Sequence, residues 1–415
     1  MNGVTILYVS YSCLPNKGSE EKLGWNISVE SAKTNRVIVV TKEEHREKIT
    51  AYLQENPIEN IEFHYVDIPG LYKKIYKGAA YSLRLNIWHK RAFPLVEKLC
   101  REKGVDVIHQ ITPIEFRSIG KYYTIPNTKF VCGPLGGGEC VPKGLKGYAA
   151  SNFLVELAHS FLNVLYKAKY KITKQLDACD YFFFTNKETQ DYIADLVKNK
   201  PQMLYSDTGI DETSFSEISK STKEPKEVFV FLVAGRMAYR KGHRLLLDAL
   251  KEIPKGYRYQ VRFVGEGPEM NKLKKRCRKY GLDQTVVFTG KLPFTQMAWE
   301  YDNAHVFVMP SIRETSGAVL LESASKNIPV IALKRFGGPI LFDETAGYFL
   351  EGNSRKEYID ALKNAMIFCM EHPEDVAQKA QNACKVAQTY TWSHKLEVYN
   401  GVYQGLVENA DQDQQ

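Results

Sequence analysis

The stretch Ser311–Glu322, which reads SIRETSGAVLLE, directly follows the apolar run Ala304–Pro310. The apolar run predicts a strand and the residues after Gly317 predict a helix, so we expect Glu314 on the loop that joins them. Glu322 is expected about two turns along the helix, on the side of its first residues, because a helix repeats roughly every 3.6 residues. The sequence therefore predicts two carboxylates beside the start of one helix.

Between these carboxylates the segment Thr315–Ala318 would present backbone N–H groups at the helix start. Such groups have no acceptor inside the helix, and phosphate is a natural ligand for them. One carboxylate before the phosphate position and one beyond it suit a ligand with hydroxyl groups at both ends. A nucleotide sugar has this chemistry and is the working hypothesis for the ligand.

Short β-branched and aromatic runs alternate with longer amphipathic stretches through most of the chain. We expect strands at Val4–Ser10, Arg36–Val40, Ile61–Val66, Val105–Gln110, Lys129–Gly133, Tyr181–Thr185, Glu227–Ala234, Tyr259–Val264, Thr285–Thr289, His305–Met309, Pro329–Ala332 and Tyr348–Leu350. This alternation is typical of parallel sheets covered by helices on both faces. Each half holds enough strands for one doubly wound α/β domain, so two Rossmann-like domains are predicted.

The domain boundary is predicted from a polar segment, SEISKSTKEPKE, that follows Phe215 and has the composition of a linker. We expect an N-terminal, acceptor-side domain over residues 1–215, a linker over 216–226 and a C-terminal, nucleotide-sugar-binding domain over 227–388. Residues 389–408 are expected to form a helix that crosses back to the N-terminal domain. The polar residues 409–415 are expected to be a frayed tail.

The composition is that of a soluble globular protein, with 44% hydrophobic and 25% charged residues in a chain of 415. The eight cysteines include no C-x-x-C pair, which predicts neither a disulfide framework nor a zinc site. No apolar run reaches the roughly 18 to 20 residues that cross a bilayer. Met1–Ser10 lacks a basic region and a cleavage site, so it is predicted to be the first strand, and we expect a cytoplasmic protein.

One region, Leu71–Lys103, is strongly basic, with nine lysines and arginines against two acids and with aromatic residues between them. Such a mixture fits a surface that meets anionic lipid head groups, which would place the protein at the inner face of the plasma membrane. The alternative is a solvated helix face whose aromatic side chains turn inward. Nucleic-acid binding is a weaker third option, because no recognised binding module accompanies the charge, and no nucleic-acid partner is expected.

Loops at the carboxyl ends of parallel strands bind ligands in open sheets, and several loops here carry polar or glycine-rich sequences. In the first half, Gly18 follows the first strand, where it could let the backbone approach a phosphate or sugar, or could simply serve a turn. His109 ends the fourth strand and could bond a sugar hydroxyl or be structural. The glycine-rich loop Gly133–Glu139 is not the dinucleotide fingerprint G-x-G-x-x-G.

The second half begins with a loop that contains fixed cations. A strand ends at Gly235 and a helix begins soon after Gly242, so Arg236 and Lys241 are expected over the cleft. Two cations there could hold a diphosphate and stabilise the charge that grows on it as it leaves. The alternative is an ordinary basic surface, because Arg240 is basic too.

Taken in order, these residues resemble glycosyltransferase family 4, whose members are retaining, nucleotide-sugar-dependent enzymes of the GT-B fold. The resemblance rests on Gly235–Gly242, Gly265–Pro268 and Pro310–Glu322 in the second half, above all on the E-x7-E pair of Glu314 and Glu322. In the first half, the Gly18, His109 and Gly133–Gly138 segments look like a bacterial branch of the family that assembles cell-surface polysaccharide. Where many members have Gly-Phe after the first glutamate, this chain has Thr315-Ser316.

The resemblance implies a role for each matching position. The diphosphate would be bound by Arg236 and Lys241, and donor-sugar hydroxyls by Glu314. Glu322 would bind the ribose, and Leu292 would border the base. The resemblance also implies His109 near the reacting sugar and a set of donor-binding positions: Gly18, Gly235, Thr315, Ser316, Gly317, Ala318 and Val319.

The implied reaction moves a hexose from a UDP- or GDP-sugar to a hydroxyl of a glycan or lipid-linked glycan, with retention of the anomeric configuration. The departing phosphate oxygen would take the acceptor proton. No D-x-D motif follows a strand, so neither a metal nor another cofactor is expected. Two alternatives stay open: another GT-B enzyme, such as a sugar-nucleotide epimerase or a phosphorylase, and a catalytically silent partner subunit.

Overall fold

The computed structural model describes residues 3–16, 18, 20–74, 81–215 and 228–412. As far as they are described, Met1–Gly138, Leu154–Asp207 and Trp392–Gln415 form one compact unit, called here the N-terminal unit. Glu139–Phe153 and Thr208–Thr391 form a second, the C-terminal unit. Each unit has its own sheet and its own hydrophobic core.

The described part of the N-terminal unit contains a seven-stranded parallel sheet in the order β3-β2-β1-β4-β5-β6-β7. The strands are β1 (Thr5–Ser10), β2 (Arg36–Lys42), β3 (Ile61–Val66), β4 (Val107–Thr112), β5 (Lys129–Leu135), β6 (Tyr181–Phe184) and β7 (Gln202–Leu204). The sequence missed β7, because a three-residue, half-buried edge strand carries no clear pattern. Its helices are α1 (Glu20–Ser31), α2 (Arg46–Glu55), α3 (Gly70–Lys73), α4 (Tyr81–Lys103), α6 (Phe153–Thr173), α7 (Lys187–Tyr192), α8 (Ala194–Val197) and α16 (Trp392–Gln412).

Both faces of this sheet are buried, and successive residues of β1 show how. Leu7 and Val9 pack in the cluster that includes Trp88 of α4. Ile6 and Tyr8 pack on the other face, in the cluster that includes residues of α1 and α16. Side chains of a strand alternate between faces, so a strand covered on both sides must be apolar at every position.

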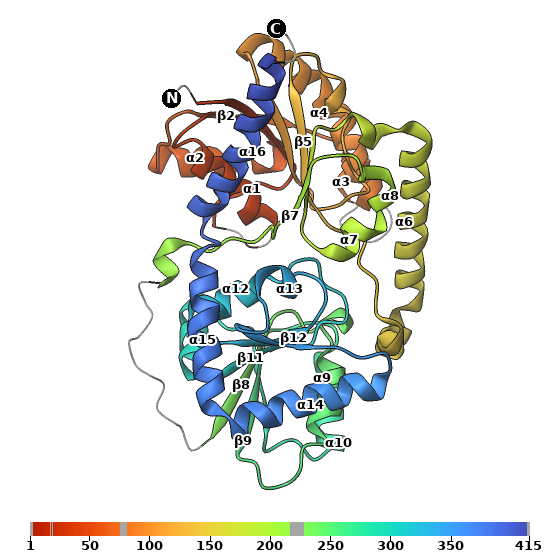
Figure 1. The fold of residues 1–415 in the computed structure, drawn as a ribbon, viewed down its shortest axis with the longest axis vertical. Coiled ribbons are helices and arrows are strands. Elements are labelled where there is room, and N and C mark those ends of the chain that lie inside the picture. Colours follow the sequence, from red (N-terminus) through yellow and green to blue (C-terminus); the bar gives the residue numbers. More distant parts are fainter. Residues whose placement is uncertain (1–2, 17, 19, 75–80, 216–227, 413–415) are drawn as a thin grey trace. The chain divides into compact units, whose positions relative to one another are not determined.

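The described part of the C-terminal unit contains a six-stranded parallel sheet in the order β10-β9-β8-β11-β12-β13 (Figure 1). The strands are β8 (Phe229–Ala234), β9 (Tyr259–Val264), β10 (Val286–Gly290), β11 (Val306–Met309), β12 (Val330–Leu333) and β13 (Gly347–Leu350). The helices are α5 (Lys146–Ala149), α9 (His243–Leu250), α10 (Met270–Lys279), α11 (Phe294–Asn303), α12 (Ala318–Ser325), α13 (Gly338–Leu341), α14 (Arg355–Glu371) and α15 (Pro373–Gln388).

The units differ in part from the expected domain ranges, and one expected range cannot be compared with them. The expected linker at residues 216–226 lies outside the described residues. The segment Glu139–Phe153 belongs to the C-terminal unit, where Tyr148 donates a 2.7 Å hydrogen bond to buried Asp248. The helix expected over 389–408 begins at Trp392, runs to Gln412 and packs in the N-terminal unit, so residues 409–412 of the expected frayed tail are helical.

The helices of the described chain include none that is both long enough and apolar enough to cross a membrane.

Candidate functional site

The strand order of the C-terminal unit reverses between β8 and β11. The chain fills the sheet from β8 to β10 on one side, then crosses to β11 on the other. Loops that leave neighbouring strands at such a switch point diverge, and the crevice between them is the usual ligand site of this fold type. The loop after β8 contains Gly235–Gly242, and the loop after β11 contains Ser311–Gly317, so both predicted motifs lie at the switch.

These two loops contact each other closely. The backbone N–H groups of Ile312 and Arg313 donate to the carbonyl of Arg240, at 2.8 and 3.2 Å. Gly242 is in the left-handed conformation, and a Cβ at this position would lie 1.7 Å from the carbonyl oxygen of Pro310. Only glycine permits this approach, which brings the cations of one loop beside the carboxylate of the other.

Glu314 is the centre of the contact. Its carboxylate, 8% exposed, forms an ion pair with Lys241 and a second with Arg240, whose Nη1 lies 3.3 Å from Oε1. The hydroxyl of Ser311 lies 3.5 Å from Oε2, and the N–H of Thr315 donates to Oε1 at 3.3 Å. Burial opposes ionisation of Glu314, but the two cations and the N–H of Thr315 outweigh it, so the pKa of Glu314 is lowered. Glu314 is therefore a carboxylate at neutral pH.

The sequence paired Arg236 with Lys241, and the structure distinguishes them. Lys241 contacts Glu314, together with Arg240, which had been left among the ordinary basic surface residues. Arg236 is exposed, and within the described residues no ion pair of its side chain is recorded. Among the described residues, the loop therefore offers two cations held by Glu314, Arg240 and Lys241, and one, Arg236, that is free to meet an anion. Arg240 could have been found from its position in the Arg240-Lys241-Gly242 sequence, but its partner could not.

The helix after Glu314 begins as expected. Gly317 precedes α12 with φ of 86°, and Ala318 and Val319 are its first residues. Ala318 is exposed and Val319 half-buried, and their N–H groups have no acceptor within the helix. Thr315 and Ser316 are half-buried, and a Cβ at Gly337 would lie 1.8 Å from the carbonyl of Ser316. The Gly337–Gly338 loop after β12 thus also borders this site, a role that the sequence motifs did not indicate.

The other predicted donor-binding residues of this unit lie nearby in the fold. Glu322 is exposed on α12 and accepts a 3.2 Å hydrogen bond from the hydroxyl of Tyr301. Leu292 follows β10 and is half-buried against the core. The N–H of Gly235 donates to the carbonyl of Val264 at 2.9 Å, and that of Gly265 donates to the carbonyl of Gly290 at 2.8 Å. These hydrogen bonds link the ends of β8, β9 and β10, where the three loops begin.

His109 is a correction to the predicted site. Its side chain is fully buried in the N-terminal unit, where Nε2 donates to the carbonyl of Gly133 and Nδ1 accepts from the hydroxyl of Tyr403, both at 2.6 Å. Burial lowers the pKa of His109 to about 3, so the ring is neutral. Both ring nitrogens are already bonded and neither reaches the surface. His109 therefore holds α16 against the sheet and is not a catalytic residue.

Gly18 lies in the loop after β1 and is exposed, and a Cβ there would meet nothing within 4 Å. Close packing therefore does not require glycine at this position. Two residues on, Glu20 accepts a 3.1 Å hydrogen bond from the N–H of Ile114. Burial raises the pKa of Glu20 to about 7. This carboxyl lies between the loops that follow β1 and β4, at the switch point of the N-terminal sheet, and no sequence motif indicated a role for it.

The basic stretch Leu71–Lys103 is described only in part, since residues 75–80 lie outside the described residues. In α4, Trp88 is buried, and Tyr81 and Phe93 pack against the core. Arg84 is buried too, with its guanidinium 2.9 Å from Glu44. The described aromatic side chains thus turn inward, as the alternative interpretation of this stretch expected.

Comparison with known proteins adds a family and several relatives. Residues 214–383 match the model of the family described as Glycosyl transferases group 1. Over 151 residues the chain is 32% identical to the sulfoquinovosyl transferase SQD2 of Arabidopsis thaliana, covering 34% of this chain and 28% of that one. Over 217 residues it is 27% identical to a D-inositol 3-phosphate glycosyltransferase of Corynebacterium kroppenstedtii, covering 48% and 47%. The match thus spans about half or less of these relatives.

Solved structures share the fold along nearly the whole chain. A glycosyltransferase from Rickettsia africae has a TM-score of 0.67 at 16% identity and covers 99% of this chain and 100% of its own. Anabaena Alr3699/HepE, solved in complex with UDP, has a TM-score of 0.58 at 16% identity and covers 99% and 100%. These likenesses confirm the predicted fold class, two Rossmann-like units of the GT-B type.

Proposed function

We propose that this protein, a GT-B chain of the glycosyltransferase family 4 type whose residues 214–383 belong to Glycosyl transferases group 1, moves a hexose from a nucleotide sugar to a hydroxyl acceptor. The family resemblance found in the sequence is confirmed. The observation that carries the reaction is the cluster at the switch point of the C-terminal sheet. There, buried Glu314 holds Lys241 beside an exposed helix start, and the described residues include no ion pair of Arg236.

The donor fits this cluster by its chemistry. Its diphosphate would lie at the first N–H groups of α12, where the helix dipole favours an anion, with Arg236 and Lys241 on its other side. Glu322, exposed on the same helix, would accept hydrogen bonds from the ribose hydroxyls. Glu314 would accept them from the hexose, which its ionised state allows. The UDP bound to Alr3699/HepE, a protein of the same fold, supports a nucleotide sugar of the UDP class, with GDP as the alternative.

The reaction breaks the bond between the anomeric carbon and the diphosphate oxygen, so negative charge grows on the diphosphate. Arg236 and Lys241 would stabilise this charge, since donors fixed in advance act most strongly where charge develops. The acceptor hydroxyl would attack from the face that the diphosphate leaves, and its proton would pass to the departing phosphate oxygen. The configuration would then be retained. Fixed cations and the helix start are proposed to do this work without a resident metal or other cofactor.

The acceptor is proposed to be a glycan or lipid-linked glycan of cell-surface polysaccharide assembly, handled at the cytoplasmic face of a membrane. Two matched relatives, from Salmonella typhimurium and Escherichia coli, carry names that assign them to colanic acid biosynthesis, and they support this class. No nucleic-acid partner is proposed. The N-terminal unit would supply the acceptor side, where the carboxyl of Glu20 titrates near neutral pH.

The test is release of free nucleotide by the full chain from a panel of UDP- and GDP-hexoses, with and without glycan acceptors. Acceptor-dependent release, with chelator present, is expected. A sugar-nucleotide epimerase would interconvert donors and release no nucleotide. Titration calorimetry that shows no heat with either UDP or GDP would instead mean a silent subunit and would overturn the proposal.

A further inference from the structure

The long helix α6 can be followed in Figure 1. One of its faces is apolar and exposed in the described chain. Leu154, Phe161 and Ile172 are 76%, 65% and 82% exposed. The other large apolar residues that are exposed on this helix are Phe153, Val155, Leu157, Val164 and Leu165. Most of them recur at intervals of three or four residues, which places them on one side of a helix. An exposed apolar surface of this extent marks an interaction site.

The opposite side of α6 is fixed to the N-terminal unit. Asn163 is buried, and its oxygen accepts a 3.0 Å hydrogen bond from Arg117. Tyr170 is buried, and its hydroxyl donates at 2.8 Å to the carbonyl of Phe116. A helix held in this way on one side presents its apolar face outward as a fixed surface.

Lysines border the apolar face near the C-terminal end of α6. Lys169 and Lys171 are exposed one turn or less before Ile172, and Lys174 follows the helix. The whole helix contains a single acid, Glu156, close to its other end. Long basic side chains beside an apolar face are typical of helices that lie in the interface of an anionic membrane, because the ammonium groups reach the head groups while the apolar residues enter the acyl region.

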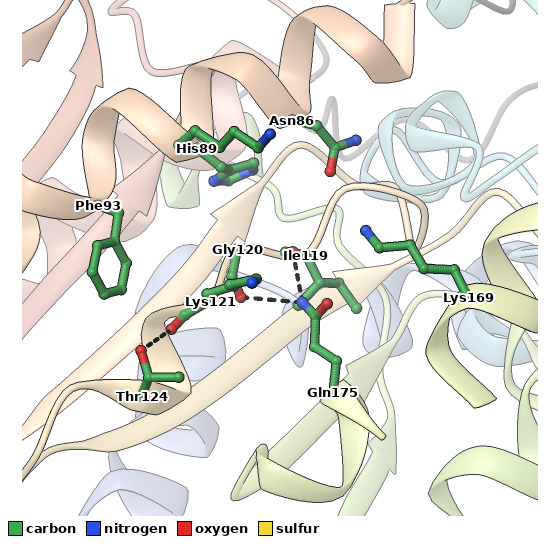
Figure 2. Close-up of a pocket in the computed structure, with 10 residues that line it drawn as sticks. Asn86, His89, Phe93, Ile119, Gly120, Lys121, Thr124, Lys169 and Gln175 are labelled. Atoms are coloured by element: carbon green, nitrogen blue, oxygen red, sulfur yellow. Dashed lines mark hydrogen bonds between the residues drawn. The ribbon is translucent and has the colours of Figure 1, made fainter. Parts of the chain in front are cut away.

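A cavity adjoins this end of α6, and Lys169 belongs to both (Figure 2). It has a volume of about 430 Å³ and is lined by Asn86, His89, Lys90, Phe93, Ile119, Gly120, Lys121, Thr124, Lys169 and Gln175. None of these lining residues is acidic. Within the described part of the chain, no ion pair of Lys90, Lys121 or Lys169 is recorded. Burial lowers the pKa of Lys169, and the nearby ammonium groups of Lys121 and Lys90 lower it further.

One buried polar group also belongs to the cavity wall. His89 is 4% exposed, and its Nδ1 lies 3.0 Å from the hydroxyl of Tyr122. Within the described residues its Nε2 makes no hydrogen bond of ordinary geometry, and the backbone of Ser118 raises the pKa of the ring less than burial lowers it. Burial holds the pKa of His89 at about 3, so the ring is neutral and Nε2 can donate to an anion. The cavity thus combines three cations and one such donor.

We propose that α6 lies in the surface of an anionic membrane and that the adjoining cavity takes the phosphate of a lipid head group. This assignment explains both the apolar face and the lysines. A protein partner or a second copy would cover the apolar face but would leave Lys90, Lys121 and Lys169 crowded beside it, with no ion pair among the described residues. The assignment places the apolar contact on α6 and not on the described aromatics of Leu71–Lys103, which face the core, while His89 and Lys90 of that stretch line the cavity. It deepens the proposed membrane location and does not depend on the proposed reaction.

The experiment is flotation of the full chain with vesicles of phosphatidylcholine alone or mixed with phosphatidylglycerol. The chain should bind the mixed vesicles and bind the neutral ones far less. Phe161→Glu with Leu157→Glu should lower binding to mixed vesicles by about tenfold or more, because two apolar side chains no longer enter the interface. Phe368→Glu, on an exposed aromatic of the C-terminal unit, is the matched control and should bind as the wild type does.

The cavity is tested by Lys121→Ala with Lys169→Ala, which should remove much of the preference for phosphatidylglycerol, a loss of roughly fivefold per lysine. Excess glycerol 3-phosphate should not release the bound chain, since the apolar contact would remain. Equal binding to neutral vesicles would overturn the head-group assignment. Absence of vesicle binding, with a dimer in light scattering that Phe161→Glu dissociates, would overturn the membrane assignment in favour of a second copy. Transferase activity on a soluble acceptor should persist in all these variants, so failure here is distinct from failure of the proposed reaction.

Discussion

The two sheets share one topology and use their switch points differently. In the C-terminal unit the loops after β8 and β11 bring Arg236, Lys241 and Glu314 to a surface-accessible helix start. In the N-terminal unit the corresponding strands β1 and β4 place His109 in the interior, under α16. The same chain path thus yields a charged binding surface in one unit and an aromatic core in the other. The difference lies in position, because Glu314 is on the loop after β11, whereas His109 is the third residue of β4 and is covered by α16.

The buried charges of the two units sharpen this comparison. Glu314 remains ionised because two cations compensate for its burial. Lys395 of α16 is fully buried, with its ammonium group bonded to the carbonyl of Ser206 and lying 4.0 Å from the ring centroid of Tyr205. Burial lowers the pKa of Lys395 to about 7, although Asp207 opposes the shift. The C-terminal unit therefore stabilises the charged form of Glu314, whereas the N-terminal unit destabilises the charged form of Lys395.

The largest effect is expected from Lys241→Ala in the C-terminal site. Loss of a fixed cation that faces the developing diphosphate charge should lower turnover by roughly 100- to 1,000-fold. Steady-state release of nucleotide measures it, with Lys251→Ala, an exposed lysine on the same unit, as the control. Near-normal turnover of Lys241→Ala would remove this residue from the mechanism.

His109→Ala should act on stability and spare the chemistry. The change leaves the hydroxyl of Tyr403 and the carbonyl of Gly133 without their buried partner, at a cost of about 2 to 4 kcal/mol in the free energy of unfolding. Urea unfolding measures this cost. Turnover of the folded variant should stay within about threefold of wild type, and a loss of turnover as large as that of Lys241→Ala would restore His109 to the active site.

Lys395 predicts a pH dependence of stability. Between about pH 7 and the ordinary lysine pKa, the unfolded chain binds a proton that the native chain lacks, so stability rises with pH, by as much as ~1.4 kcal/mol per pH unit. The difference in unfolding free energy between wild type and Lys395→Met isolates this contribution. From pH 7 to pH 9 the unfolding free energy of the wild type should rise relative to that of Lys395→Met. A difference in unfolding free energy that does not change with pH would show that Lys395 is charged in the native protein.

Glu322→Ala should have the smallest effect, and this effect should be limited to the affinity for the donor. Its proposed partner, the ribose, is remote from the breaking bond, so the dissociation constant of the nucleotide should rise by roughly five- to tenfold while turnover at saturation changes little. Titration calorimetry with UDP and GDP measures the affinity. Tyr301→Phe removes only the hydroxyl that donates to Glu322, and its nucleotide affinity should lie between those of Glu322→Ala and wild type. Unchanged affinity in Glu322→Ala would contradict the ribose assignment.

Much of the fold followed from local pattern. Apolar runs such as Val306–Met309 are buried strands, and their alternation with amphipathic stretches predicted two parallel sheets. The loop and helix of Ser311–Glu322 also lie as predicted, since Gly317 and the residues after it encode a helix start locally. Whether Arg236 or Arg240 is the partner of Glu314 could not be predicted. The two arginines are close together on one loop, and only the path of the backbone after Gly235 decides which side chain reaches Glu314.

The sequence by itself determined what depends on neighbours in the chain: the strands, the helix start beside Glu314 and the basic loop after β8. Only the tertiary structure decided what depends on distant segments. His109 is buried by Tyr403, 294 residues away, and the outer face of α6 remains exposed because no described segment packs on it. Periodicity reports which side of a helix or strand is apolar. Which segment covers that side, or whether any does, is set by contacts between residues far apart in sequence.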